Sequence, residues 1–223
     1  VFSHASKDIF LTVHGDDFLA TASPADLDWF EKAILTKFEG KIKGRLRNPG
    51  DELRVLNRVV RRSEDGYEWE ADQRHAEMLI AGVGLDSDSR ALSAPGRKLT
   101  SKELEDEPEP LGAQESTSFR AMAARANFLV SDRPDTAFAV KELCCQMSAP
   151  TVGAWRCLKR LCRYLLVVRN IDIVFPSTNF EMVLDVYADS DWAGCKSTRK
   201  STSGGFICPG GGALKSWSGS QAS

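Results

Sequence analysis

The chain of 223 residues has 42% hydrophobic and 27% charged residues and a formal net charge of −2, the composition of an ordinary globular protein with one or two domains. This balance gives no overall sign of nucleic-acid binding, and no apolar run approaches the ~20 residues that a membrane helix needs. We therefore expect no membrane partner. The six cysteines lack C-x-x-C spacing and zinc-finger histidines, and there is no secretion signal or glycosylation sequon, which indicates reduced thiols in an intracellular protein.

Charge is unevenly distributed along the chain. Residues 37–62 hold nine Lys and Arg against three acids, and residues 143–171 hold five basic residues and no acid. Such blocks are usually solvated faces, although phosphate-binding surfaces have the same composition.

The first predicted elements are two short strands joined by an acidic turn. Apolar, β-prone runs at 9–13 and 18–22 flank His14-Gly15-Asp16-Asp17, and a Gly-containing turn between such runs predicts a β-hairpin. Adjacent carboxylates repel each other unless a cation screens them, and Mg²⁺ takes hard oxygen ligands. The competing interpretation is an ordinary Asp-rich turn, because Asp and Gly favour turns for backbone reasons.

Further elements follow up to residue 84. Ser23 and Pro24 predict the start of a helix that ends near Gly40, since a Ser cap followed by Pro is typical of a helix N-terminus. The pattern then predicts a strand over Leu53–Val60, a short strand at 67–69 and a helix over 72–83. Residues 85–116 are rich in Ser, Pro, Gly and acids and are predicted to be a linker and the main domain boundary.

Helices are predicted from residue 116 to about 170, with a break at 131–135, where Pro134 opens a second helix that ends near Ser148. In the helix over 151–168, apolar residues occupy one face and Arg156, Lys159, Arg160 and Arg163 lie largely on the other. A solvated basic face of an amphipathic helix is the favoured interpretation. Phosphate contact is the alternative.

The pattern changes to β structure after residue 171. Strands are predicted at 171–175 and 182–188, and a hairpin joins 204–208 to 213–217 through a glycine-rich turn. Asp189 follows the second of these strands, where a metal ligand could lie, although Asp-x-Asp sequences also occur in many turns.

Three sets of motifs resemble one known family. The hairpin with Asp16 and Asp17 resembles the catalytic hairpin of reverse transcriptases, with His14 where that family usually has Tyr. Residues 133–140 resemble the Arg-Pro-Asp segment of its helical connection. The ordered motifs Asp-Ser-Asp-Trp-Ala-Gly (189–194), Lys-Ser-Thr-Ser-Gly (200–204) and Gly-Gly-Ala with Ser-Trp (211–217) resemble the start of the RNase H domain in copia-type retrotransposon polyproteins.

The resemblance implies an α+β or α/β fold. It would comprise a remnant of the reverse-transcriptase palm and a thumb-like segment, a helical connection, and a partial RNase H-like mixed sheet. The implied division is a reverse-transcriptase part over 1–84, a linker over 85–116, a helical connection over 117–170 and an RNase H-like part over 171–223.

The resemblance also implies two-metal phosphoryl transfer on RNA and DNA. Asp16, Asp17 and Asp189 would be catalytic ligands of Mg²⁺ or Mn²⁺. The implied partners are an RNA template, a DNA primer, the RNA/DNA hybrid, deoxynucleotide triphosphates and the upstream and downstream parts of the same polyprotein, in the cytoplasm or a virus-like particle with nuclear access. The residues expected to contact nucleic acid are His14, Arg156, Arg160, Arg163 and Lys200.

Both implied sites are incomplete in this sequence. The family's third polymerase Asp would precede residue 1, and the remaining RNase H carboxylates would follow Ser223. We therefore expect the isolated chain to be inactive. Two alternatives stay open: a non-catalytic remnant that binds nucleic acid or a partner, and an unrelated α/β metal-binding domain, which the three ordered motifs disfavour.

Overall fold

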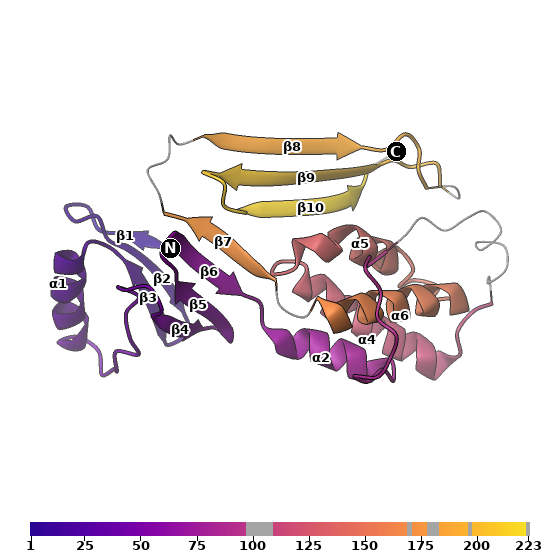
Figure 1. Cartoon of the computed structure of the whole chain (residues 1–223), viewed down its shortest axis with the longest axis horizontal. Coiled ribbons are helices and arrows are strands. Elements are labelled where there is room, and N and C mark those ends of the chain that lie inside the picture. Colours follow the sequence, from indigo (N-terminus) through magenta and orange to yellow (C-terminus); the bar gives the residue numbers. More distant parts are fainter. Residues whose placement is uncertain (97–108, 169–170, 178–182, 196–197, 222–223) are drawn as a thin grey trace. The chain divides into compact units, whose positions relative to one another are not determined.

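The protein is an α+β chain made of small antiparallel sheets and a helical core (Figure 1). A computed structural model describes residues 1–96, 109–168, 171–177, 183–195 and 198–221. The chain divides into two compact units, Val1–Gly44 and Arg45–Ser223. Each unit is described by itself.

The first unit is a three-stranded antiparallel sheet followed by one helix. The strands are β1 (Phe2–Ser3), β2 (Phe10–His14) and β3 (Asp17–Thr21), in the order β1-β2-β3. Helix α1 (Pro24–Leu35) begins as the sequence predicts, because the side chain of Ser23 accepts a hydrogen bond from the Asp26 N–H and Pro24 occupies the first turn. The predicted hairpin and the predicted start of its following helix are therefore confirmed, whereas the helix ends at Leu35, before its expected end near Gly40.

Packing in the first unit is sparse. Ile9 is its only buried residue, and α1 buries none of its side chains. Phe2, Phe10 and Trp29 are respectively 64%, 53% and 42% exposed. The unit consequently depends more on backbone pairing than on an apolar core.

The second unit begins with a four-stranded antiparallel sheet in the order β4-β5-β6-β7. Its strands are β4 (Glu52–Val55), β5 (Arg58–Arg62), β6 (Gly66–Glu70) and β7 (Asp172–Pro176). The prediction of one continuous strand over Leu53–Val60 is wrong. Leu56 and Asn57 adopt positive φ values of 50° and 67°, so the chain turns back there and forms the β4–β5 hairpin.

The helices of the second unit surround one hydrophobic core. They are α2 (Gln73–Gly82), α4 (Ala113–Leu129), the short 3₁₀ helix η1 (Pro134–Thr136), α5 (Ala137–Cys145) and α6 (Val152–Val167). Phe119, Leu158 and Leu165 are fully buried at its centre. The predicted break before Pro134 and the predicted helix over 151–168 are confirmed, whereas the middle helix ends at Cys145, earlier than its expected end near Ser148.

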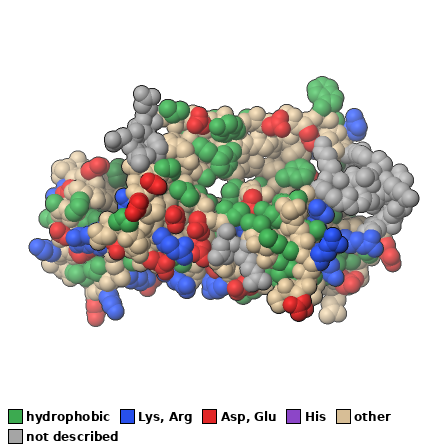
Figure 2. Space-filling view, in the orientation of Figure 1, with side chains coloured by type: hydrophobic (Ala, Val, Ile, Leu, Met, Phe, Trp, Pro, Cys, Tyr) green, Lys and Arg blue, Asp and Glu red, His purple; other side chains and the backbone are tan. Residues whose placement is uncertain are grey.

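A third sheet, also antiparallel, follows in the order β10-β9-β8. It consists of β8 (Leu184–Ser190), β9 (Thr202–Pro209) and β10 (Lys215–Ser220). Hydrophobic side chains reach the surface over this sheet (Figure 2), among them Val186 and Tyr187, which are 56% and 63% exposed. The described sheets are all antiparallel, in contrast to the mixed sheet that the resemblance implies.

The predicted linker at 85–116 lies partly outside the described residues, which omit 97–108. Its described flanks pack on the helices: Leu85 and Leu111 contact the core, and the Leu111 N–H donates to the Pro150 carbonyl at 3.0 Å. In addition, β7 pairs with β6, so one sheet combines residues from the predicted first and last domains. The boundaries at 84, 116 and 170 divide the chain into parts with different predicted functions. The fold does not test such a division, so these boundaries stay predictions.

Candidate functional site

The acidic hairpin has the geometry of a two-residue turn. His14 pairs with Asp17, which leaves Gly15 and Asp16 at the tip of the β2–β3 hairpin. Gly15 has a φ of +60°, and positive φ at the first central position is typical of a type II′ turn, where Gly is preferred. A side chain at residue 15 would strain the backbone that presents both aspartates.

Both candidate carboxylates are accessible to solvent. Asp16 is exposed at the turn, and the side chain of Asp17 is 43% exposed. Side chains of directly paired residues on neighbouring strands point to the same face of a sheet. His14 is exposed and pairs with Asp17, so the two side chains share a face. The structure therefore brings three predicted site residues together at one end of the sheet.

Lys43 supplies a positive charge next to the two aspartates of this turn. Its ammonium group donates a hydrogen bond to Asp17 Oδ1. The contact with Asp17 is the main reason that the pKa of Lys43 is raised, and the charge of Asp16 adds to it. The predicted basic block at 37–62 contained this residue, but nothing in the sequence paired it with Asp17.

The donor set at the hairpin suits a hard divalent cation. Two adjacent carboxylates match the one or two carboxylates that Mg²⁺ commonly uses beside substrate phosphates, and both can be reached from solvent. Within the described residues, no group of three or more His, Cys, Asp or Glu side chains could hold a metal ion. A substrate or other ligands would therefore have to supply the remaining coordination.

Asp189 lies inside β8 rather than beyond its end. It pairs with Gly204 on β9 and is exposed, and β8 continues one residue further to Ser190. Asp189 lines an open hollow between β8–β10 and residues 134–138. Gly204 has no side chain, so its position on β9 does not cover the Asp189 carboxylate.

Asp191 stabilises the turn that follows β8. Its Oδ1 atom accepts hydrogen bonds from the Thr202 N–H at 2.7 Å and the Gly194 N–H at 3.3 Å. These bonds join the end of β8 to the start of β9. The backbone carbonyl of Lys200 accepts from the Cys195 N–H at 3.1 Å in the same turn.

The Arg-Pro-Asp segment forms a buried ion pair. Arg133 is 1% exposed and donates to both carboxylate oxygens of Asp135, at 2.9 and 2.7 Å. The Tyr164 hydroxyl donates to Asp135 at 2.7 Å, and burial, followed by this contact, raises the pKa of Tyr164. Asp135 lines the same hollow as Asp189, but its charge is already balanced by Arg133.

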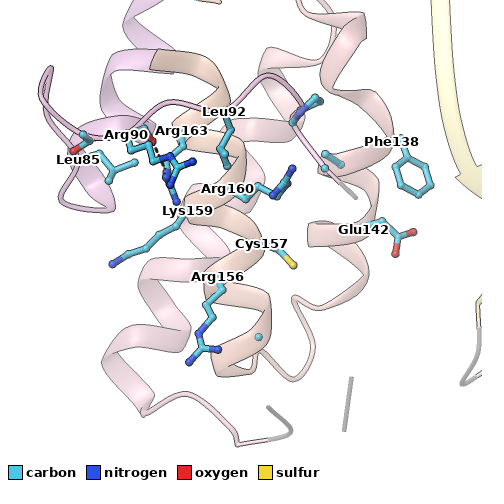
Figure 3. A pocket seen from close by; sticks show the side chains of 15 residues that line it. Leu85, Arg90, Leu92, Phe138, Glu142, Arg156, Cys157, Lys159, Arg160 and Arg163 are labelled. Atoms are coloured by element: carbon cyan, nitrogen blue, oxygen red, sulfur yellow. Dashed lines mark hydrogen bonds between the residues drawn. The ribbon is translucent and has the colours of Figure 1, made fainter. Parts of the chain in front are cut away.

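The predicted basic helix residues line a pocket in the second unit. Arg156, Arg160 and Arg163 of α6 lie there together with Lys159 and Arg90 (Figure 3). Arg90 was missed in the sequence because its segment carries no motif. Only the fold shows that this segment returns to α6.

Comparisons with known proteins find relatives of several kinds, among them secreted RxLR effector protein 161 of Plasmopara viticola, which is 36% identical over 44% of the chain and 67% of that protein. The chain is 31% identical to the uncharacterized mitochondrial protein AtMg00810 of Arabidopsis thaliana over 59% of its own length and 52% of that protein. It is 34% identical to the retrovirus-related Pol polyprotein from transposon RE2 of A. thaliana over 41% of the chain and 6% of the polyprotein. It is 23% identical to the corresponding polyprotein from transposon TNT 1-94 of Nicotiana tabacum over 94% of the chain and 15% of that protein.

The chain thus spans about half of AtMg00810 and small parts of the polyproteins. No protein-family model matches the sequence. No solved structure matches the fold. Among the described residues, no helix has both the length and the apolar character needed to cross a membrane.

Proposed function

We propose that this chain, which is homologous to the retrovirus-related Pol polyproteins of copia-type transposons, carries parts of an RNA-directed DNA polymerase and of its RNase H. The observation that carries the proposal is the pair Asp16 and Asp17 at the accessible tip of the β2–β3 hairpin. Phosphoryl transfer needs carboxylates that solvent, metal and substrate can reach together. The solvent exposure of both carboxylates supports the proposal.

In the polymerase part, Asp16 and Asp17 would hold Mg²⁺ or Mn²⁺ next to a deoxynucleotide triphosphate. When bound, such ions stabilise the charge on attacking and leaving oxygens in an in-line displacement. Lys43 keeps the charge of Asp17 balanced and would have to give up this contact when a cation binds. His14, on the same face as Asp17, would contact the primer or template backbone.

In the RNase H part, Asp189 would hold the same kind of cation against the RNA strand of a hybrid. Asp191 fixes the β8–β9 turn through its hydrogen bonds to Thr202 and Gly194, so it positions the end of the strand that carries Asp189. Lys200 lies in this turn, where it would contact the hybrid backbone.

We further propose that the chain works only with other parts of the same polyprotein. Each candidate site offers one or two carboxylates, which is fewer than a two-metal clamp requires, so the isolated chain is expected to be inactive. The RNA template, DNA primer and hybrid are the proposed substrates. Function in the cytoplasm or a virus-like particle, with access to the nucleus, follows from the same proposal.

The test uses the polyprotein that contains this chain. Asp17→Asn is expected to abolish primer extension and to leave hybrid cleavage in place, and Asp189→Asn is expected to do the reverse. Asp8→Asn, just before β2, and Asp185→Asn, four residues before Asp189 on β8, are exposed matched controls that should change neither activity. Full primer extension by the Asp17→Asn polyprotein would overturn the polymerase assignment and favour a non-catalytic remnant.

A further inference from the structure

A pocket of about 570 Å³ in the second unit combines cationic side chains from separate parts of the chain. It is bounded by α6, by α5 and by residues 85–96 (Figure 3). Five basic residues line it, against Glu142 as the single acid among the described lining residues. The basic residues are Arg90, Arg156, Lys159, Arg160 and Arg163.

The walls of the pocket are fixed by contacts within the chain. The Leu92 N–H donates to the Arg163 carbonyl at 3.2 Å, and the Arg163 Nε atom donates to the Arg90 carbonyl. At the other side, Gly96 approaches α5 so closely that an added Cβ would lie 2.9 Å from the Ala139 Cβ. Residues 85–96 are therefore held against both helices, and the cationic groups are gathered before any ligand binds.

Arg160 carries an unsatisfied hydrogen-bond donor in the pocket. It is half-buried, and its Nε atom is buried without a hydrogen-bond partner among the described residues. A buried guanidinium N–H without an acceptor costs free energy that a ligand oxygen would recover. Figure 3 shows the Arg160 side chain extending from α6 toward the side of the pocket formed by Phe138 and Glu142.

We propose that this pocket binds consecutive phosphates of a nucleic-acid strand, with Arg160 as the central donor. The proposal rests on the proposed function, since it takes nucleic acid as the substrate. Arg156, Arg160 and Arg163 are four and three residues apart on one helix, which spaces them over about 10 Å at ~1.5 Å per residue. Within a duplex, one strand presents a phosphate every ~3.4 Å along the helix axis, so about three phosphates lie within that length.

The spacing of the arginines, rather than their type, favours a phosphate backbone over an acidic peptide. Four of the five basic residues are arginines, whose N–H fork matches phosphate and carboxylate oxygens alike. Their regular spacing on a rigid helix matches the regular charge of a nucleic-acid backbone. The ring of Phe138 is 39% exposed and has the Lys141 ammonium 5.3 Å from its centroid, so its other face is the one on which a base would stack.

The test measures binding of the full chain to a fluorescently labelled single-stranded DNA by anisotropy, in EDTA and over a series of salt concentrations. Arg160→Gln is expected to weaken binding about tenfold at low salt, the loss typical of one charged hydrogen bond. It should also reduce the magnitude of the log–log salt slope by about 0.7, the contribution of one phosphate contact on a single strand. Arg125→Gln, which removes the same charge from α4 outside the pocket, is the matched control and should change neither quantity.

Circular dichroism of each variant checks that the helices are retained. Equal weakening by Arg160→Gln and Arg125→Gln would mean that only overall charge matters and would overturn the proposal. A second outcome would also overturn the proposal. If Arg160→Gln weakens binding of polyglutamate but leaves DNA binding unchanged, the pocket binds an acidic peptide.

Because EDTA removes divalent cations, this assay does not depend on the aspartates. Normal DNA binding by Arg160→Gln together with loss of activity in the Asp17→Asn and Asp189→Asn polyproteins would refute the pocket alone. The opposite pair of results would refute the catalytic proposal alone.

Discussion

The first unit and the helical part of the second unit differ sharply in how they are held together. Ile9 is the only buried residue among residues 1–44, whereas 18 buried hydrophobic residues form the core of α2, α4, α5 and α6. The candidate polymerase carboxylates lie on the sparsely packed unit, where a hairpin turn sets their position. The phosphate pocket lies on the densely packed one, where helices hold its cations.

This difference teaches that the two proposed sites obtain their geometry in different ways. Asp16 and Asp17 owe their placement to local backbone preferences, chiefly the positive φ of Gly15. Arg90 and Arg163, in contrast, meet through packing of segments far apart in the sequence, since the hydrogen bond between them joins residues 73 positions apart.

The largest expected effect distinguishes the two units directly. Phe119→Ala removes a fully buried ring from the helical core and is expected to lower the free energy of unfolding by about 3–5 kcal/mol. Phe10→Ala removes a ring that is 53% exposed on β2 and is expected to cost no more than about 0.5 kcal/mol. Urea denaturation followed by far-UV circular dichroism measures the first, and amide exchange of β2 and β3 measures the second. Similar losses of unfolding free energy for the two substitutions would contradict the difference in packing between the two units.

The same contrast explains which parts of the fold could be predicted from the sequence. The hairpin around Gly15, the Ser23 cap and the α6 stripe are local signals, and each predicted element is present. The β4–β5 turn was missed because Leu56 and Asn57 lie in a run of β-prone residues, with no glycine to indicate the positive φ values.

Long-range features could not be predicted from local pattern. The pairing of β7 with β6 and the burial of Arg133 depend on which segments meet in three dimensions. At the candidate sites, the aspartates were singled out by motifs that resemble a known family, and the basic face of α6 by its helical spacing. Lys43 and Arg90 were not, because a single basic residue in an irregular segment has no periodicity.

A smaller effect is expected at the helix caps, which exist in both units. Asp72 caps α2 and is 6% exposed, and Asp72→Ala is expected to cost about 1 kcal/mol at neutral pH. The hydrogen bonds from the Arg74 side chain are the main reason that the pKa of Asp72 is lowered. This contribution is therefore present above the ordinary pKa of an unfolded Asp and is lost as the pH falls through the lower folded pKa.

Ser23→Ala in α1 is the matched cap substitution of the first unit, and its hydroxyl does not titrate in this range. Thermal unfolding of the wild type and both variants between neutral and acidic pH checks this prediction. A pH-independent cost for Asp72→Ala would show that its charge does not contribute.

The most direct test of the central claim is a titration of the chain with Mn²⁺, followed by paramagnetic broadening of its amide resonances. The account predicts early, localised broadening at residues 14–18, which is lost in the Asp16→Asn/Asp17→Asn variant and retained in the exposed control Asp8→Asn. Uniform broadening at acidic residues over the whole chain, or unchanged broadening at the hairpin of the double variant, would contradict it.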